Sequence, residues 1–207
     1  MNDPHQEHLP RLERRNYQRH AVVHWTMTVQ KRATGWMDDA FHQHFRELML
    51  HASAREDLSC PAYCLMPDHL HLMWMGLRLG TDQLNGIKFL REYLNKLLAT
   101  RSSRRQSVVT SSTDSRPQLP SEFRLQKQTH DHVLKEDERR RNAFARVCFY
   151  VLENPVRANL VERAQDWPFS GALVPGYPSL QPFEEEFWPT FWKVYVTKRD
   201  SEAPSQP

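Results

Sequence analysis

The sequence lacks the features that mark several large classes of protein. Its six glycines form no glycine-rich loop of the kind that cradles a nucleotide phosphate. No apolar run approaches the ~18 residues that cross a membrane, and the first residues hold no apolar stretch typical of a secretory signal. We therefore expect a cytoplasmic protein that has no membrane partner, and the sequence offers no nucleotide-binding loop.

The cysteines also exclude a class of protein. Cys60, Cys64 and Cys148 do not have the spacing of a disulfide framework, and their odd number is typical of a reducing compartment. Cys60 and Cys64 are close enough in sequence to act as metal ligands. Buried free thiols are the more common interpretation of such residues.

The charge balance alone says little about partners. The chain has 28 Lys and Arg against 25 Asp and Glu, a net charge of +3. The arginines are clustered, however, and clusters of this kind can neutralise phosphates. For any one cluster, a solvated helix surface is the simpler interpretation. The clusters are Arg11, Arg14, Arg15 and Arg19; Arg101, Arg104 and Arg105; and Arg139, Arg140 and Arg141.

Hydrophobic periodicity predicts an alternation of strands and helices. The expected elements are, in order, a strand at 21–29, a helix at 38–55 capped by Asp38 or Asp39, strands at 61–66 and 69–75 joined as a hairpin by Pro67-Asp68, a helix at 81–99 capped by Thr81, a strand within 123–135, and a helix at 137–153 that turns or kinks at Pro155. The order β-α-β-β-α-β is that of the ferredoxin-like unit. We therefore predict an α+β fold, with an antiparallel sheet, helices on one face and a further helix after the unit.

Composition divides the chain into three parts. Residues 1–19 are polar and basic, which favours a flexible basic arm, and residues 20–172 hold the predicted domain. Within that domain, residues 100–121 are rich in Ser, Thr and Arg, and we interpret them as a disordered insert. Residues 173–207 form a C-terminal extension with prolines and aromatics.

Two histidines stand out in the apolar segment YCLMPDHLHLMW, residues 63–74. Alternate residues of a strand share one face, so His69 and His71 should point the same way. Two adjacent imidazoles can chelate a divalent metal. A pair of surface or hydrogen-bonded histidines explains the spacing equally well, and spacing alone favours that interpretation.

A second candidate pair precedes Pro155. Tyr150 and Asn154 are four residues apart, so they lie on one face of the predicted helix. A tyrosine hydroxyl can act as a nucleophile and an asparagine oxygen as a metal ligand. A core-edge aromatic and a helix-terminal asparagine are the ordinary alternatives.

Three segments together resemble a known family. YCLMPDHLHLMW, LQKQTHDHVLK and YVLENPVRANLVERAQDWPFSG occur in the order found in the REP-associated tyrosine transposases of the HUH single-tyrosine superfamily. The resemblance covers roughly residues 17 to 172. The family's HUH motif falls on His69 and His71, its catalytic tyrosine on Tyr150, and its third metal-ligand position, often a glutamine, on Asn154. Leu125 stands where the family usually has Trp, and Lys135 where it usually has Arg.

The resemblance implies an activity on DNA. Such enzymes cut single-stranded DNA at hairpin sites formed by palindromic repeats, through a 5′-phosphotyrosine intermediate, and rejoin it in transposition. It implies Mg²⁺ or Mn²⁺ as cofactor, held by His69, His71 and Asn154. A phenol, with a pKa of about 10, needs activation to attack at neutral pH, and a metal that polarises the phosphate supplies part of it.

Several questions remain open at this stage. Arg14, Arg15 and Arg157 are nominated for contact with DNA phosphates, and the protein is expected to be a monomer or homodimer. His130, Asp131 and His132 match a family motif without an assigned role, although a structural hydrogen-bonding role is the default for Asp131. The alternatives are a domesticated protein that binds DNA hairpins without cleaving them, or a metal-dependent hydrolase that uses the histidine pair.

Overall fold

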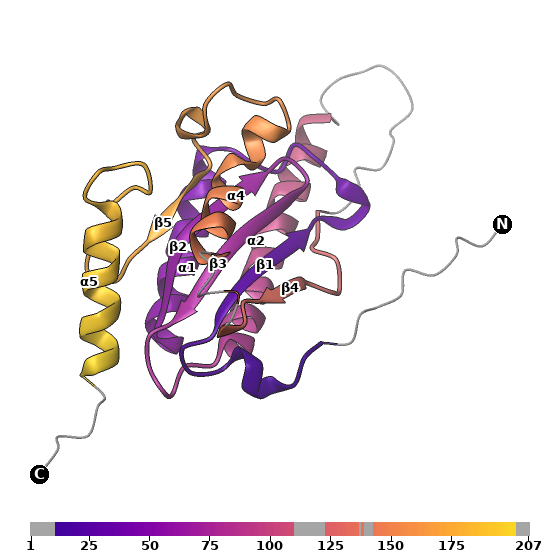
Figure 1. Ribbon diagram of the computed structural model, residues 1–207. Helices are drawn as coiled ribbons and strands as arrows, with labels where there is room; N and C mark the ends of the chain where they lie inside the picture. Colours follow the sequence, from indigo (N-terminus) through magenta and orange to yellow (C-terminus); the bar gives the residue numbers. More distant parts are fainter. Residues whose placement is uncertain (1–10, 110–122, 137, 139–142, 202–207) are drawn as a thin grey trace, which may run out of the picture.

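A computed structural model describes residues 11–109, 123–136, 138 and 143–201, with only the backbone described for 103–109 (Figure 1). Several predictions concern parts that are not described. Residues 1–10 of the predicted arm, 110–121 of the predicted insert and the cluster Arg139 to Arg141 lie outside the described residues, as do the side chains of Arg104 and Arg105.

Five antiparallel strands form one sheet in the order β4-β1-β3-β2-β5 (Figure 1). The hairpin of β2 and β3 is confirmed, because Met66 pairs with His69 across the predicted Pro67-Asp68 turn. The four strands of the predicted unit have the expected antiparallel pairing, so the α+β fold class is confirmed. The strands are β1 (Val22–Thr28), β2 (Leu58–Met66), β3 (His69–Gly76), β4 (His130–Val133) and β5 (Ser170–Leu173).

The helices cover both faces of this sheet (Figure 1). Because side chains alternate along a strand, Trp25 of β1 and Trp74 of β3 share one face with the core side of α1 and α2. Met73 of β3 points to the opposite face and packs in a second core with Cys148 of α4 and Phe191 of α5. The helices are α1 (Asp39–Glu56), α2 (Gln83–Val109), α4 (Ala143–Arg157) and α5 (Phe187–Asp200), with short 3₁₀ turns at η1 (Arg14–Tyr17), η2 (Gln30–Arg32) and η3 (Ala164–Asp166).

The helix starts follow capping chemistry. The Asp38 carboxylate accepts a hydrogen bond from the Phe41 N–H at 2.8 Å, so Asp38 caps α1. The predicted Thr81 cap of α2 is wrong, because it is the Asp82 carboxylate that accepts from the Leu84 N–H, at 3.0 Å. The Thr81 hydroxyl instead donates to the Asp57 carbonyl at 3.1 Å, which ties the start of α2 to the end of α1.

Several bounds differ from the predicted ones. The helix α2 continues to Val109, so residues 100–109 of the predicted insert are helical. The helix α4 runs through Pro155 and ends at Arg157 instead of turning at the proline. The strand β5 and the helix α5 were not predicted, because their segments are short, or interrupted by prolines and aromatics that lack a clear period.

The described part of the N-terminal arm is held against the domain. Tyr17 is fully buried, and its hydroxyl donates to the Asp131 carboxylate of β4 at 2.5 Å. Burial and this carboxylate both raise the pKa of Tyr17 above its usual value. Side chains of residues 11–19, which were expected to be flexible, therefore contact β4 and the start of α2. None of the described helices is long and apolar enough to span a bilayer.

A prediction concerns Gly76, at the end of β3. A Cβ at this position would lie 1.7 Å from the Arg19 carbonyl oxygen, which is backbone and cannot move aside without breaking the turn. We expect Gly76→Ala to lower the free energy of unfolding by about 2 kcal/mol or more, as measured by chemical denaturation. Gly80→Ala is the matched control, because a Cβ there would meet nothing within 4 Å. Equal stabilities of the two variants would contradict the packing described here.

Candidate functional site

The two histidines of β3 lie on the same face and point at each other. The Nε2 atoms of His69 and His71 are 3.0 Å apart. On its other side, His69 Nδ1 lies 2.5 Å from the Asp68 carboxylate, which also accepts a hydrogen bond from Arg32 at 2.7 Å. Burial opposes ionisation of Asp68, but the hydrogen bonds from His69 and Arg32 outweigh it and lower the pKa of this carboxyl. The ionised Asp68 therefore requires a proton on His69 Nδ1. In the neutral form of His69, the lone pair is on Nε2 and is directed at His71.

A third histidine, His24 of β1, joins the pair. His71 Nδ1 lies 3.1 Å from His24 Nε2 and 3.1 Å from the Thr26 hydroxyl. The two imidazole rings are stacked, with centroids 5.1 Å apart. His24 was missed by sequence reasoning. Its alternation with Thr26 in β1 was visible, but only the register of β1 against β3 shows that both reach His71.

Burial keeps these imidazoles neutral. Desolvation, followed by the neighbouring His24 and His69, lowers the pKa of His71 to about 3, although Asp68 acts in the opposite direction. Desolvation, followed by the neighbouring His132, lowers the pKa of His24 to about 4. At neutral pH both rings therefore carry a nitrogen lone pair that can accept a hydrogen bond or bind a metal.

The distance between His69 and His71 fits a shared cation. Two nitrogen ligands at about 2.1 Å from a metal and about 90° apart are separated by about 3.0 Å. If His71 Nδ1 carries the proton, two lone pairs face each other across the observed 3.0 Å, which is favourable only with a cation between them. The other His71 tautomer would place an N–H···N hydrogen bond there.

These two imidazoles do not make a complete metal site from the usual side chains. Among the described residues, no group of three or more His, Cys, Asp and Glu side chains is placed to hold a metal ion. Any further ligands would have to be amide oxygens, water or a bound phosphate.

Tyr150, on α4, lies directly over the histidines. Its ring centroid is 6.0 Å from that of His71 and 6.0 Å from that of His24, with the rings nearly perpendicular. The side chain is 39% exposed, which leaves it open to a substrate. The Arg157 guanidinium carbon lies 4.6 Å from the Tyr150 ring centroid, so a positive charge accompanies the tyrosine.

Asn154 has a structural role in α4. Pro155 has no N–H and therefore leaves the Val151 carbonyl without its usual helical partner. The Asn154 side-chain nitrogen donates to the Tyr150 carbonyl at 2.8 Å and approaches the Val151 carbonyl at 3.4 Å. These contacts occupy the Asn154 side-chain nitrogen and leave its oxygen without a described partner, and its assignment as a metal ligand stays a prediction.

The three nominated arginines differ in surroundings. Arg14 donates to Asp82 at 2.7 Å and to Asn85 at 2.9 Å, so it fastens the N-terminal segment to α2. Arg15 is a largely exposed side chain that pairs with Glu13 at 3.0 Å. Of the three, Arg157 alone is described in contact with Tyr150.

The remaining motif residues are distributed around the edge of the site. Asp131 accepts from Tyr17 and lies 3.4 Å from Arg11, which agrees with the default structural role. In β4, His132 pairs directly with His24 of β1 in register, and its Nε2 lies 3.3 Å from Glu138.

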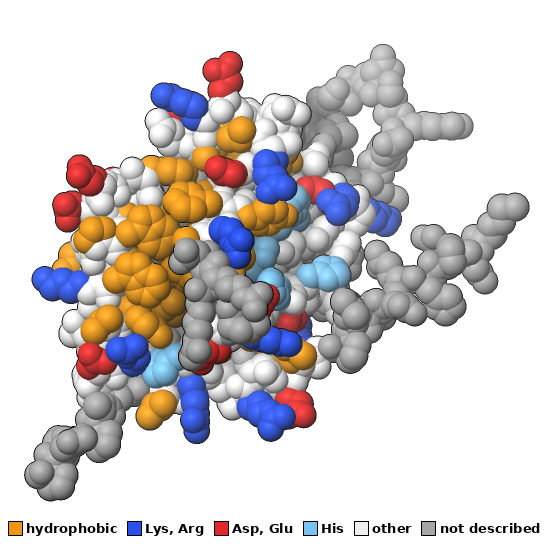
Figure 2. All heavy atoms as spheres, in the orientation of Figure 1, with side chains coloured by type: hydrophobic (Ala, Val, Ile, Leu, Met, Phe, Trp, Pro, Cys, Tyr) orange, Lys and Arg blue, Asp and Glu red, His pale blue; other side chains and the backbone are white. Residues whose placement is uncertain are grey.

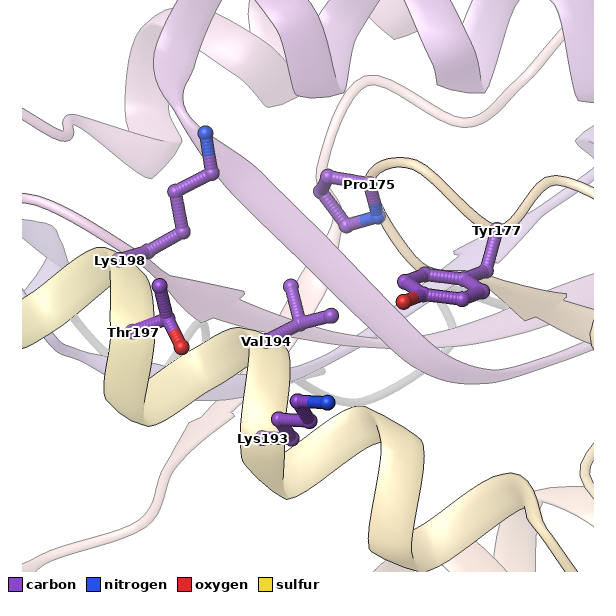
Figure 3. Close-up of a pocket in the computed structure, with 6 residues that line it drawn as sticks. All are labelled: Pro175, Tyr177, Lys193, Val194, Thr197 and Lys198. Carbon is purple, nitrogen blue, oxygen red and sulfur yellow. The ribbon is translucent and has the colours of Figure 1, made fainter.

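Two hollows open on the surface. One, of about 520 Å³, lies beside the tyrosine and is lined by Arg146, Val147, Phe149, Tyr150, Glu153 and Arg157. In Figure 2, which views the molecule in the orientation of Figure 1, histidine side chains lie together near the middle of the visible face, next to Lys and Arg. The other, of about 250 Å³, is formed by α5 and the turn after β5, and no residue of β1, β3 or α4 lines it (Figure 3).

Known proteins resemble this chain in sequence and in fold. No family profile matches the chain. A Haemophilus influenzae protein provisionally named a REP-associated tyrosine transposase is 21% identical over 157 residues, which are 76% of this chain and 82% of that protein. A solved structure of a REP-associated tyrosine transposase bound to a REP hairpin superposes with a TM-score of 0.52 and 16% identity, over 78% of this chain and 82% of that one.

This chain resembles the REP-associated tyrosine transposases in sequence and in fold. Both comparisons lead to the same group of proteins. At these identities the structural likeness establishes the fold.

A prediction tests the structural role of Asn154. Neither Asn154→Ala nor Asn154→Asp retains an N–H donor for the carbonyls of Tyr150 and Val151, so both variants should lose about 1 kcal/mol in the free energy of unfolding. Asn154→Gln keeps the donor and is the control. Chemical denaturation at neutral pH measures the three values, and an unchanged stability of Asn154→Asp would show that the side-chain nitrogen does not support the helix.

Proposed function

We propose that this protein cuts single-stranded DNA beside a hairpin and rejoins it through a 5′-phosphotyrosine on Tyr150, with Mg²⁺ or Mn²⁺ held by His69 and His71. The observation that carries the proposal is the packing of the exposed Tyr150 against His71, whose Nε2 atom lies 3.0 Å from that of His69. The similarity to a REP-associated tyrosine transposase, and to a structure of such an enzyme with a REP hairpin, supports this choice of substrate.

The reaction is a transesterification. The Tyr150 oxygen attacks the scissile phosphorus and forms a new P–O bond, while the bond from phosphorus to the 3′ oxygen breaks. The electron pair of that bond goes to the 3′ oxygen, which is released as a hydroxyl after taking up a proton, and the phenol proton goes to solvent. Attack by another 3′-hydroxyl on the phosphotyrosine reverses the step, so the phosphodiester energy is conserved.

The side chains around Tyr150 have matching roles. Asp68, anchored by Arg32, holds the ring of His69, and strand β3 keeps His71 beside it. A bound cation supplies a Lewis acid that polarises the scissile phosphate. Arg157, beside the tyrosine ring, provides positive charge for the phosphate that forms there.

The third ligand is assigned to the Asn154 oxygen, as the resemblance implies. The Asn154 side-chain nitrogen is committed to the helix backbone, so the oxygen is the atom left to bind a cation. An asparagine side chain is one methylene shorter than a glutamine side chain. To share a cation with His69 and His71, α4 must therefore lie closer to them than it would with a glutamine at this position.

The hollow beside Tyr150 suits unpaired DNA next to the cut. Phe149 is 47% exposed at its wall and offers a face on which a base can stack. Arg157, in the same wall, can contact the phosphate backbone. We also assign Arg15, which is exposed on the N-terminal segment, to contact with a DNA phosphate. Arg14 is a weaker candidate for such a contact, because its guanidinium is already paired with Asp82.

A metal-dependent hydrolase is less well supported. Such an enzyme would need carboxylate ligands to complete the histidine pair. Asp131, one of the two nearby candidates, is bonded to Tyr17 and Arg11, and Asp68 is bonded to Arg32 and His69. Both carboxylates therefore already have hydrogen-bond partners that hold them in place.

The first prediction concerns the nucleophile. Hairpin-bearing single-stranded oligonucleotides, taken from palindromic repeats flanking the gene, should form a covalent protein–DNA adduct with Mn²⁺ that survives denaturing electrophoresis. Tyr150→Phe should abolish this adduct, because it removes the attacking oxygen. Tyr93→Phe, at another exposed tyrosine on α2, should leave it unchanged. Cleavage that persists in Tyr150→Phe would favour a hydrolase, and hairpin binding without any cleavage would favour a domesticated binding protein.

The second prediction separates chemistry from binding. His69→Ala should reduce cleavage below detection while changing the hairpin dissociation constant by no more than about threefold, because the histidine acts on the reacting phosphate. Gel-shift titration and the adduct assay measure the two effects. His51→Ala, at an exposed histidine of α1, is the control. Loss of hairpin binding in a folded His69→Ala protein would assign the histidine a structural role instead.

A further inference from the structure

The two histidines of β3 have different partners at their outer nitrogens. His69 Nδ1 faces the carboxylate of Asp68, which can only accept a hydrogen bond and so fixes the tautomer of that ring. His71 Nδ1 faces a second imidazole, the Nε2 of His24, together with the Thr26 hydroxyl. Both of these partners can either accept or donate, so the His71 tautomer depends on how they are protonated.

A metal ligand needs its lone pair on the nitrogen that faces the cation. For His71 that nitrogen is Nε2, so Nδ1 must carry the proton and needs an acceptor. Histidines that bind metals usually donate this second N–H to a carboxylate, a carbonyl or a water. In β1, two groups lie 3.1 Å from His71 Nδ1, the His24 Nε2 atom and the Thr26 hydroxyl.

We propose that His24 is a positioning residue for the metal site. It accepts a hydrogen bond from His71 Nδ1–H and thereby keeps the His71 Nε2 lone pair directed at the cation shared with His69. This inference rests on the proposed function, and it assigns to His24 the part that Asp68 has for His69.

The surroundings of His24 favour this role over two others. Its Nε2 is directed at His71 Nδ1, at 3.1 Å, and so cannot bind the shared cation itself. It also stacks on His71 and meets the edge of Tyr150, so simple packing beneath the tyrosine is the competing explanation. If His24 acts as a hydrogen-bond acceptor, a replacement must keep a polar atom at this position. If His24 only packs beneath Tyr150, a replacement must keep an aromatic ring.

Two substitutions exploit this opposition. His24→Phe keeps an aromatic ring of similar shape and removes the acceptor. His24→Gln removes the ring but can place its amide oxygen near the position of the imidazole Nε2. The full-length protein and both variants are titrated with Mn²⁺ alone by calorimetry, without DNA, and circular dichroism checks the fold.

We expect His24→Phe to weaken Mn²⁺ binding about tenfold, at the low end for such partners because Thr26 remains as a second acceptor. His24→Gln should stay within about threefold of the wild type. Nitrogen-15 spectra of the wild type and of His24→Gln, both saturated with diamagnetic Mg²⁺, should show the His71 proton on Nδ1. If His24→Phe does not fold, His24→Leu takes its place.

The opposite order would overturn the proposal. Wild-type affinity in His24→Phe with weakened binding in His24→Gln would make His24 a packing residue. His69→Ala is measured in the same series to keep the two proposals apart. If His69→Ala loses Mn²⁺ binding and His24→Phe does not, the role of His24 fails and the proposed function stands. If the wild type binds no Mn²⁺, the proposed function and the inference both fail.

Discussion

The antiparallel register of β1 against β3 brings the side chains of the candidate site together on one face of the sheet. Thr26 pairs with His71, so His24, two residues earlier in β1, lies within hydrogen-bonding distance of the same ring. A shift of one residue would turn His24 and Thr26 to the face packed by α1 and α2. The apolar residues of β1 oppose such a shift, because Trp25 is fully buried on that face, with its indole N–H bonded to Gln83 at 3.0 Å. The core on one face therefore fixes the site on the other.

The helix α4 both packs onto the sheet and carries two of the candidate site residues. Cys148, Val151 and Leu152 pack it onto the sheet, and this packing places Tyr150 over His71 at the margin of the buried face. Pro155 interrupts the helical hydrogen bonds one turn later, and the Asn154 amide compensates within the same turn. The residue that restores the helix is thus also the one that the family resemblance assigns to the metal. The two roles use different atoms, the nitrogen for the helix and the oxygen for the cation, so they are compatible.

Local pattern was sufficient for the parts of this fold that local forces determine. The alternation of β3 placed His69 and His71 on one face, and the turn at Pro67-Asp68 defined the hairpin. What could not be predicted depends on contacts between distant segments. The fifth strand, β5, is only four residues long and is stabilised by pairing with β2, and the segment 11–19 is ordered by the contact of Tyr17 with Asp131. His24 belongs to this second group, because a histidine in an apolar strand has no visible partner until the register is known.

The neutral state of the histidines bears on the choice between cleavage and simple hairpin binding. A surface that only attracts DNA gains from charged side chains, yet burial lowers the pKa of His24 to about 4 and leaves that ring uncharged at neutral pH. Buried polar groups normally satisfy one another, as His71 Nδ1 does with His24 and Thr26. At the centre of the cluster, the Nε2 atoms of His69 and His71 face each other and need either a proton or a cation between them. The uncharged rings of His24 and His71 add little to a phosphate-binding surface, which favours the proposed cleavage over simple hairpin binding.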